Sequence, residues 1–153
     1  MGWGKEPPSP REMAIALLAR REYSRAELAT RLQAKQIPAD DIALCLDELA
    51  DRGWQSDARF AASFIRTRVL RGQGWRRIEN DLRQRGVDGE IIRAAHNDVV
   101  EQEAIDWFEL ARDVLVRRFD SPGQTPKERA RRERFLLGRG FDYEQIRYAL
   151  SCL

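Results

Sequence analysis

The amino-acid sequence predicts an all-α protein of about nine helices, grouped into three stacked three-helix repeats. The main observation is a pattern in which a leucine is followed, five and ten residues later, by two further apolar residues. It occurs three times, at Leu32, Ile37 and Ile42, at Leu82, Val87 and Ile92, and at Leu136, Phe141 and Ile146. The copies are 50 and 54 residues apart, which is typical of helical units that cannot bury their apolar faces alone. The second observation is that the alternation expected of β-strands is found nowhere in the chain.

The period divides the 153 residues into a short N-terminal segment and three repeats. The segment is residues 1–10, and the repeats are residues 11–54, 55–99 and 100–153. Residues 1–10 contain three of the six prolines and two of the ten glycines. Because these residue types interrupt regular structure, we expect the segment to be disordered.

Three helices are expected in the first repeat, and the first of them starts at Arg11. Ser24 and Glu27 have the spacing of a capping box, in which the hydroxyl and the carboxylate each satisfy an otherwise unpaired amide at the start of the second helix. Pro38 suits the opening of the third helix, and Gly53 ends it. The apolar residues expected to face inward on these last two helices are Leu28, Leu32, Ile42, Leu46 and Leu49.

The second repeat opens at Ser56 with a helix of roughly fifteen residues. Gly72 and Gly74 separate this helix from the next, which starts at Trp75. Gly86 supplies the left-handed residue that lets the second helix stop without steric cost. The residues expected to be buried are Phe60, Ala61, Phe64, Ile65, Val69 and Leu70 on the first helix, and Ile91, Ile92, Ala95 and Val99 on the third.

The third repeat starts with a longer helix that carries apolar residues from Ala104 to Phe119. A loop at Ser121–Pro126 follows and accounts for the longer second period. The helix Lys127–Leu137 then ends at Gly138 and Gly140. A final helix carries Ile146, Tyr148, Ala149 and Leu150.

Nothing in the sequence indicates catalysis or metal binding. His96 is the only histidine and lies at a semi-buried repeat position, where a structural role is far more common than a catalytic one. Cys45 and Cys152 lie in apolar surroundings and are interpreted as buried small residues. The stretch Gly72–Gly74 lacks the strand and the Lys-Ser/Thr pair of a phosphate-binding loop. We therefore expect no catalytic residue, no metal, no cofactor and no small-molecule substrate.

The location expected from the sequence is the cytoplasm. No apolar run approaches the length needed to span a bilayer, so no membrane contact is expected. The N-terminal residues lack the apolar core of a signal peptide. The two isolated thiols suit a reducing compartment and do not indicate a disulfide.

Charge is the feature that points to a binding function. Charged residues make up 34% of the chain, yet the net charge is only +2, and 24 of the 27 cations are arginine. A guanidinium binds phosphates and carboxylates bidentately, so the arginine bias favours a surface that holds anions. A genome that favours arginine codons would give the same composition without a function.

Two dense basic blocks lie on or beside the second helices of repeats two and three. The first block consists of Arg66, Arg68, Arg71, Arg76, Arg77, Arg83 and Arg85, and the second of Lys127, Arg129, Arg131, Arg132, Arg134 and Arg139. Stacking would place both on a shared surface that suits a phosphate backbone or an acidic protein groove. The structural alternative is that these cations solvate helices and pair with neighbours four residues away.

A second functional alternative comes from the first repeat. Residues 23–28, followed by the helix that ends at Gly53, resemble a winged-helix unit of a transcription factor. A wing would require two strands next, but Ser56 opens a helix instead. The alternative is therefore a stand-alone helical DNA-binding module, a winged-helix-like transcription or architectural factor that places the same arginines on phosphates.

Three spaced motifs carry a family resemblance. They are Asp57-x-Arg59-Phe60-Ala61, Gly74-x-Arg76-x-Ile78-x3-Leu82-x3-Gly86-Val87, and Leu136-Leu137-x-Arg139-Gly140-Phe141-x-Tyr143-x2-Ile146. With these motifs the chain, over roughly residues 11–153, resembles the RecX family of bacterial proteins that regulate the RecA recombinase.

The resemblance implies three tandem repeats in an elongated, curved molecule. It further implies binding in the groove of the RecA filament on single-stranded DNA, with inhibition of ATP hydrolysis, strand exchange and repressor co-cleavage. The two basic blocks would then meet acidic RecA surfaces, or contact the DNA directly, or both.

Overall fold

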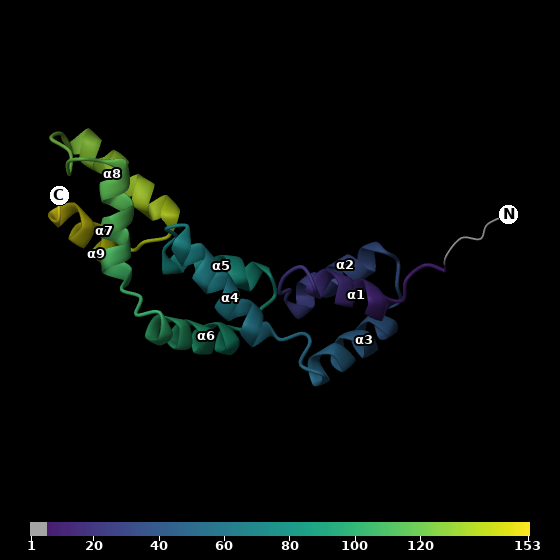
Figure 1. Ribbon diagram of the computed structural model, residues 1–153. Helices are drawn as coiled ribbons and strands as arrows, with labels where there is room; N and C mark the ends of the chain where they lie inside the picture. Colours follow the sequence, from purple (N-terminus) through teal and green to yellow (C-terminus); the bar gives the residue numbers. More distant parts are fainter. Residues whose placement is uncertain (1–5) are drawn as a thin grey trace.

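The computed structural model describes residues 6–153, and it confirms the predicted all-α class (Figure 1). Within this range the chain forms no strand, and its nine helices are α1 (Pro10–Leu18), α2 (Arg25–Ala34), α3 (Ala39–Asp51), α4 (Asp57–Leu70), α5 (Trp75–Gln84), α6 (Gly89–Gln102), α7 (Trp107–Arg118), α8 (Pro126–Arg139) and α9 (Tyr143–Ser151). Residues 1–5 of the segment expected to be disordered lie outside the described residues. Residues 6–9 are exposed and have no regular secondary structure.

The helices form three units, which we call repeat 1 (α1–α3), repeat 2 (α4–α6) and repeat 3 (α7–α9). Figure 1 shows the units following one another along an arc, with α1 near one end and α9 near the other, so the molecule is elongated and curved. Each unit has its own core. The largest fully buried side chains of these cores are Leu28, Leu32, Leu46 and Leu49 in repeat 1, Ile65, Ile78, Leu82 and Ile92 in repeat 2, and Leu115, Leu136, Phe141 and Ile146 in repeat 3.

The repeated leucine pattern of the sequence corresponds to a repeated helix end. Each second helix is followed by a residue with a positive φ. This angle is 61° at Gln36 after α2, 79° at Gly86 after α5 and 103° at Gly140 after α8. The next N–H returns to the leucine carbonyl five residues earlier, as in Ile37 to Leu32 at 3.4 Å. This is a Schellman motif, whose apolar contact between those two residues explains why both positions are apolar in every copy.

Gln36 is the one non-glycine residue among these three positions, and we expect Gln36→Gly to stabilise the protein. A left-handed conformation costs an L-residue about 1–2 kcal/mol, and the greater freedom of glycine in the unfolded chain offsets part of the gain. The net increase in the free energy of unfolding, measured by urea denaturation, should be about 0.5–1 kcal/mol. The control is Gln33→Gly, which lies inside α2 and should destabilise the protein by about 1 kcal/mol. An unchanged or lower stability for the Gln36 variant would contradict the prediction.

Consecutive second helices meet end to end. At the joint between repeats 1 and 2, the Ser24 hydroxyl donates to the carbonyl of Arg85 at 2.8 Å. Ser24 also forms the predicted capping box with Glu27 at the start of α2. Since the first amides of a helix have no partner within it, the N-terminus of α2 is satisfied partly by its own cap and partly by repeat 2, where the Asp57 carboxylate accepts from the N–H of Arg25 at 2.8 Å.

The joint between repeats 2 and 3 includes two hydrogen bonds between backbone groups. The N–H of Gly74 donates to the carbonyl of Arg139 at 2.7 Å, and the N–H of Arg76 donates to the carbonyl of Gly140 at 3.1 Å. Helix α5 has no side-chain cap, so these carbonyls of repeat 3 satisfy its first amides. At Gly74 the backbone of repeat 2 therefore lies directly against the backbone of repeat 3, with no side chain between them.

Several local expectations were wrong. Leu70 is 86% exposed, because it lies about 140° around α4 from the buried Ile65 and so faces away from the core. Ala104 is not part of a helix: it has a φ of 50° and ends α6 by a turn like that of Gly53, and α7 starts only at Trp107. Gly138 lies inside α8, and Cys152 is exposed while Cys45 is buried.

Candidate functional site

The predicted basic residues divide into paired and unpaired groups. Arg68 is bound tightly to Asp81 at 2.7 Å, and its guanidinium also donates to Gln73. The other three paired members are Arg66 with Glu103 at 3.3 Å, Arg83 with Glu79 at 3.5 Å, and Arg85 with Glu27 at 3.5 Å. Among residues 6–153, no carboxylate lies within ion-pair distance of Arg71, Arg76, Arg77, Lys127, Arg129, Arg131, Arg132, Arg134 or Arg139. Pairing with helix neighbours thus explains only a minority of them.

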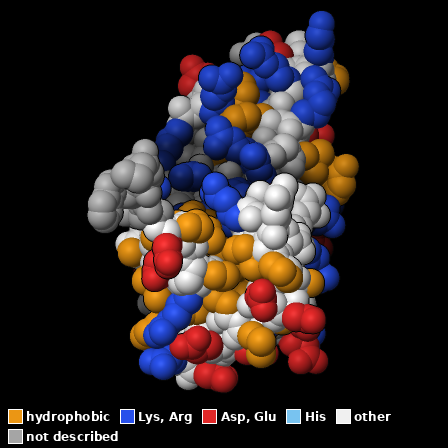
Figure 2. Space-filling model, turned by 90° about the vertical axis from the view of Figure 1, so that its right-hand side faces the viewer, with side chains coloured by type: hydrophobic (Ala, Val, Ile, Leu, Met, Phe, Trp, Pro, Cys, Tyr) orange, Lys and Arg blue, Asp and Glu red, His pale blue; other side chains and the backbone are white. Residues whose placement is uncertain are grey.

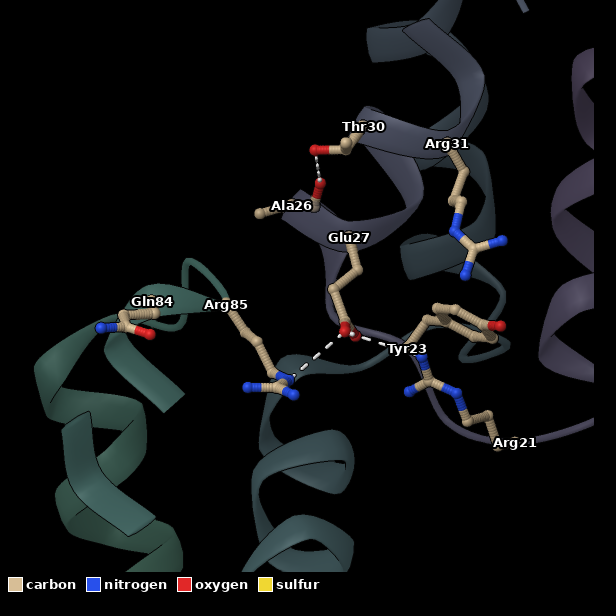
Figure 3. Close-up of a pocket in the computed structure, with 8 residues that line it drawn as sticks. All are labelled: Arg21, Tyr23, Ala26, Glu27, Thr30, Arg31, Gln84 and Arg85. Atoms are coloured by element: carbon tan, nitrogen blue, oxygen red, sulfur yellow. Dashed lines mark hydrogen bonds and ion pairs between the residues drawn. The ribbon is translucent and has the colours of Figure 1, made fainter. Parts of the chain in front are cut away.

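Five arginines line two adjoining cavities where repeat 1 meets repeat 2. A cavity of about 220 Å³ is lined by Arg21, Arg31 and Arg85 together with Tyr23 and Glu27 (Figure 3). A second cavity, of about 330 Å³, lies beside α4. Arg21 and Arg85 line both cavities, and the second adds Arg68 and Arg71.

Aromatic rings contact four of these five guanidinium groups. The guanidinium of Arg21 lies 3.7 Å from the centre of the Tyr23 ring, and Arg31 approaches the same ring to 5.9 Å. Figure 3 shows the ring between the two arginines. Arg68 and Arg85 lie 4.3 Å and 4.8 Å from the centre of the Phe64 ring. Cation–π contacts of this kind fix the direction of a guanidinium, and they do not use its edge donors, which in Arg68 are bound to Asp81 and Gln73.

The arginines continue toward repeat 3. The guanidinium of Arg139 donates to the carbonyl of Arg71 at 3.4 Å, and that of Arg77 donates to the carbonyl of Gly138 at 3.3 Å. The Arg139 guanidinium therefore contacts the backbone of Arg71, a residue that lines the second cavity, across the second joint. We use the term basic groove for Arg21, Arg31, Arg68, Arg71, Arg85 and Arg139.

The remaining predicted residues lie outside the basic groove. Arg66 lines a different, largely apolar cavity with Val69 and Leu70. Arg132 is tied to its own repeat, because its guanidinium donates to the carbonyls of Ser121 and Glu128. The other members of the second block that are exposed on α8 are Lys127, Arg129, Arg131 and Arg134. In the end-on view of Figure 2, Lys and Arg side chains gather over the upper half, the side on which α8 lies in Figure 1.

Two groove residues, Arg21 and Arg31, were missed by the sequence analysis. Repeat 1 carries a net charge of −1, so its arginines do not stand out by density. The available signal was spacing, because Arg31 follows Glu27 by four residues and lies on the same face of α2. The density of charge along the chain therefore predicted which helices carry the cations, but not which face of the molecule they line.

His96 packs between two tryptophans. Its ring centre lies 4.3 Å from that of Trp75 and 5.9 Å from that of Trp107, and the Trp107 indole N–H donates to His96 Nε2 at 3.2 Å. The indole therefore occupies this ring nitrogen. The contact joins α5, α6 and the start of α7, which is a packing role at the second joint.

Other groups with possible chemistry are similarly constrained. Burial raises the pKa of the Cys45 thiol, with the Glu48 carboxylate adding to the effect and Arg11 opposing it, so its thiolate is disfavoured. The hydrogen bond from the Tyr148 hydroxyl to Glu109 raises the pKa of Tyr148 to about 12.

Among residues 6–153 no three His, Cys, Asp or Glu side chains are grouped to hold a metal ion. No helix in this range is both long and apolar enough to cross a membrane.

Known families match most of the helical part of the chain. Families described as the first, second and third three-helix domains of RecX match residues 11–49, 56–95 and 104–150. The chain belongs to the RecX family. The "Regulatory protein RecX" of Chromohalobacter salexigens is 56% identical over 143 residues, which cover 94% of this chain and 91% of that protein. The protein of the same name from Acidithiobacillus ferrooxidans is 41% identical over 147 residues, covering 95% and 91%.

The fold is also that of solved RecX structures. The crystal structure of RecX from Lactobacillus salivarius aligns with a TM-score of 0.77 over 94% of each chain at 21% identity. The basic groove takes residues from all three RecX domains: Arg21 and Arg31 from the first, Arg68, Arg71 and Arg85 from the second, and Arg139 from the third.

Proposed function

We propose that this protein regulates RecA by lying along the RecA filament on single-stranded DNA, and that it thereby inhibits ATP hydrolysis, strand exchange and repressor co-cleavage. Its relatives are named "Regulatory protein RecX". RecA is proposed as the partner because the RecX family is one of RecA regulators. The observation that carries the proposal is the basic groove, which runs across both joints of a curved stack. The thirteen cations predicted from the sequence remain the proposed contact set, and the groove residues among them form its centre.

A curved repeat stack suits a helical polymer for a physical reason. Each of its repeats can reach a different part of the polymer surface, so weak single contacts are linked. Linking converts each later contact into an intramolecular event, which raises the overall affinity without requiring any tight contact. Arginine edges are suited to either anion that such a filament offers, the carboxylates of the protein or the phosphates of the DNA.

The experiment that tests the proposal measures the DNA-dependent ATPase of RecA on single-stranded DNA. We expect this protein to suppress hydrolysis at concentrations too low to coat the DNA, because a regulator acts through the filament. A stand-alone DNA-binding module would act only by covering the DNA. Inhibition that appears only near one protein per binding site on the DNA, or is lost in DNA excess at fixed filament concentration, would contradict the proposal.

A further inference from the structure

The cavity lined by Arg21, Arg31 and Arg85 contains one carboxylate, that of Glu27, while Glu22 lines the adjoining cavity and pairs with Arg59. Glu27 extends from α2 into the cavity between repeats 1 and 2, and dashed lines in Figure 3 join it to Arg85 and Arg21. Its Oε2 atom lies 3.5 Å from Nε of Arg85 and 3.7 Å from a terminal nitrogen of Arg21. The carboxylate therefore occupies the space between cations of two different repeats, where an external anion would bind.

Glu27 is held there by its cap and only loosely by the arginines. Its Oε1 atom accepts the N–H of Ser24 at 3.0 Å, which completes the capping box of α2. The distances to the two guanidinium groups are longer than charge-assisted hydrogen bonds, which are usually about 2.7–2.9 Å. The Glu27 side chain is 18% exposed, whereas those of Arg21 and Arg85 are 49% and 34% exposed. The arginines can thus turn toward solvent while Glu27 stays in its cap.

The cavity also has an excess of positive charge. Arg31 lines it from the same helix as Glu27, and no carboxylate within residues 6–153 pairs with Arg31. One carboxylate therefore faces three guanidinium groups. The cavity therefore keeps a net positive charge beside Glu27, which favours the entry of a second anion.

We propose that the Glu27 carboxylate occupies a phosphodiester-binding site when DNA is absent, and that DNA phosphates displace it from Arg21 and Arg85. We call this role of Glu27 an internal plug. This rests on the proposed function, since it names the filament DNA as the partner of the groove. One observation favours a nucleic-acid backbone over an acidic protein: cations are present in both cavities and again at Arg139 of repeat 3, which fits a polymer of regularly spaced charges. The rings of Tyr23 and Phe64 carry guanidinium groups on their faces, so the contact expected with DNA is through its phosphates.

The test is Glu27→Gln, which removes the charge and keeps the cap, because an amide oxygen accepts the Ser24 N–H equally well. We expect this variant to bind a fluorescein-labelled oligo(dT) about threefold more tightly by anisotropy. Oligo(dA) should show the same gain. The control is Glu101→Gln, which makes the same charge change at an exposed position of α6 outside the groove and should leave affinity unchanged.

A second variant tests the cation that has no partner. Arg31→Gln should weaken oligo(dT) binding, and it should reduce the slope of log affinity against log salt by about 0.7, the value for one lost contact to a single strand. Arg93→Gln on α6 is its control. Circular dichroism melts establish that all four variants are folded.

The outcomes are decisive. Equal affinities for Glu27→Gln and Glu101→Gln would overturn the plug. If poly-glutamate binds more tightly to Glu27→Gln while oligo(dT) does not, the groove takes acidic protein and the phosphodiester assignment is wrong. Suppression of the RecA ATPase by the wild type is measured in parallel. An ATPase effect without the oligo(dT) gain rejects the plug alone, and the gain without an ATPase effect rejects the proposed function alone.

Discussion

Gly74→Ala is expected to lower the free energy of unfolding by about 3 kcal/mol or more and to loosen repeat 3 from repeat 2. The φ of Gly74 is −83°, which alanine adopts readily, so the cost is steric. An added Cβ would lie 2.5 Å from the carbonyl carbon and oxygen of Gly140 and 2.7 Å from the N–H nitrogen of Phe141. These are backbone atoms, which cannot move aside as a flexible side chain would. The hydrogen bond from Gly74 to Arg139 would lengthen with them.

The measurement is thermal and urea unfolding by circular dichroism, with small-angle scattering to follow the shape. The midpoint should fall by about 6–12 °C, and the radius of gyration should rise as the stack opens. The matched control is Gly138→Ala, a position inside α8 with nothing within 4 Å of the added carbon. That variant should be more stable than the wild type, by up to about 1 kcal/mol. A Gly74→Ala protein that melts and scatters like the wild type would show that the joint is not close-packed.

The second large effect is expected from neutralising the groove. The triple variant Arg71→Gln, Arg85→Gln and Arg139→Gln should need about 100-fold more protein for half-inhibition of the RecA ATPase, given about 1 kcal/mol for each lost contact. Glutamine keeps much of the apolar stem, so the packing of Arg85 on Phe64 and of Arg139 on Phe135 is largely retained. Helicity and melting temperature should stay close to those of the wild type.

The control for this variant changes the same amount of charge elsewhere. Arg93, Arg117 and Arg147 are exposed, lie outside the groove and have no carboxylate partner among residues 6–153. Their combined replacement by glutamine should leave inhibition within about twofold of the wild type, since charges away from the contact act only through the screened long-range field. Equal losses in the two triple variants would mean that net charge, and not the groove, determines inhibition.

The sequence predicted the architecture well because its strongest signal has one physical cause. The leucine pattern marks a Schellman motif at the end of α2, α5 and α8, and that motif repeats because all three repeats close their second helix in the same way. Ala104 shows the limit of this signal. It follows the end of α6 with a positive φ, but alanine is the residue most favourable to helices, so no residue type there indicates a stop.

The candidate site was predicted less well because the density of charge along a chain does not tell toward which side of a helix each side chain points. Arg66 and Arg68 are two residues apart, so they lie about 200° apart around α4 and face different cavities. Arg68 and Arg71 are three apart and share a face. Helical spacing could have separated these cases, but the contribution of Arg21 and Arg31 required the packing of α2 against α5, which no local pattern encodes.

The end-to-end row of second helices has a consequence for how such proteins can change in length. Each joint uses the N-terminus of one second helix and the final turn of the next, so it is directional and does not close into a ring. The middle repeat contributes the C-terminal half of the first joint and the N-terminal half of the second, so it has a contact surface at both ends. At the end of α2, Gln36 has a side chain at the position where Gly86 and Gly140 contact Ala26 and Arg77 of the preceding repeat. The length of such a molecule therefore increases by one three-helix repeat at a time.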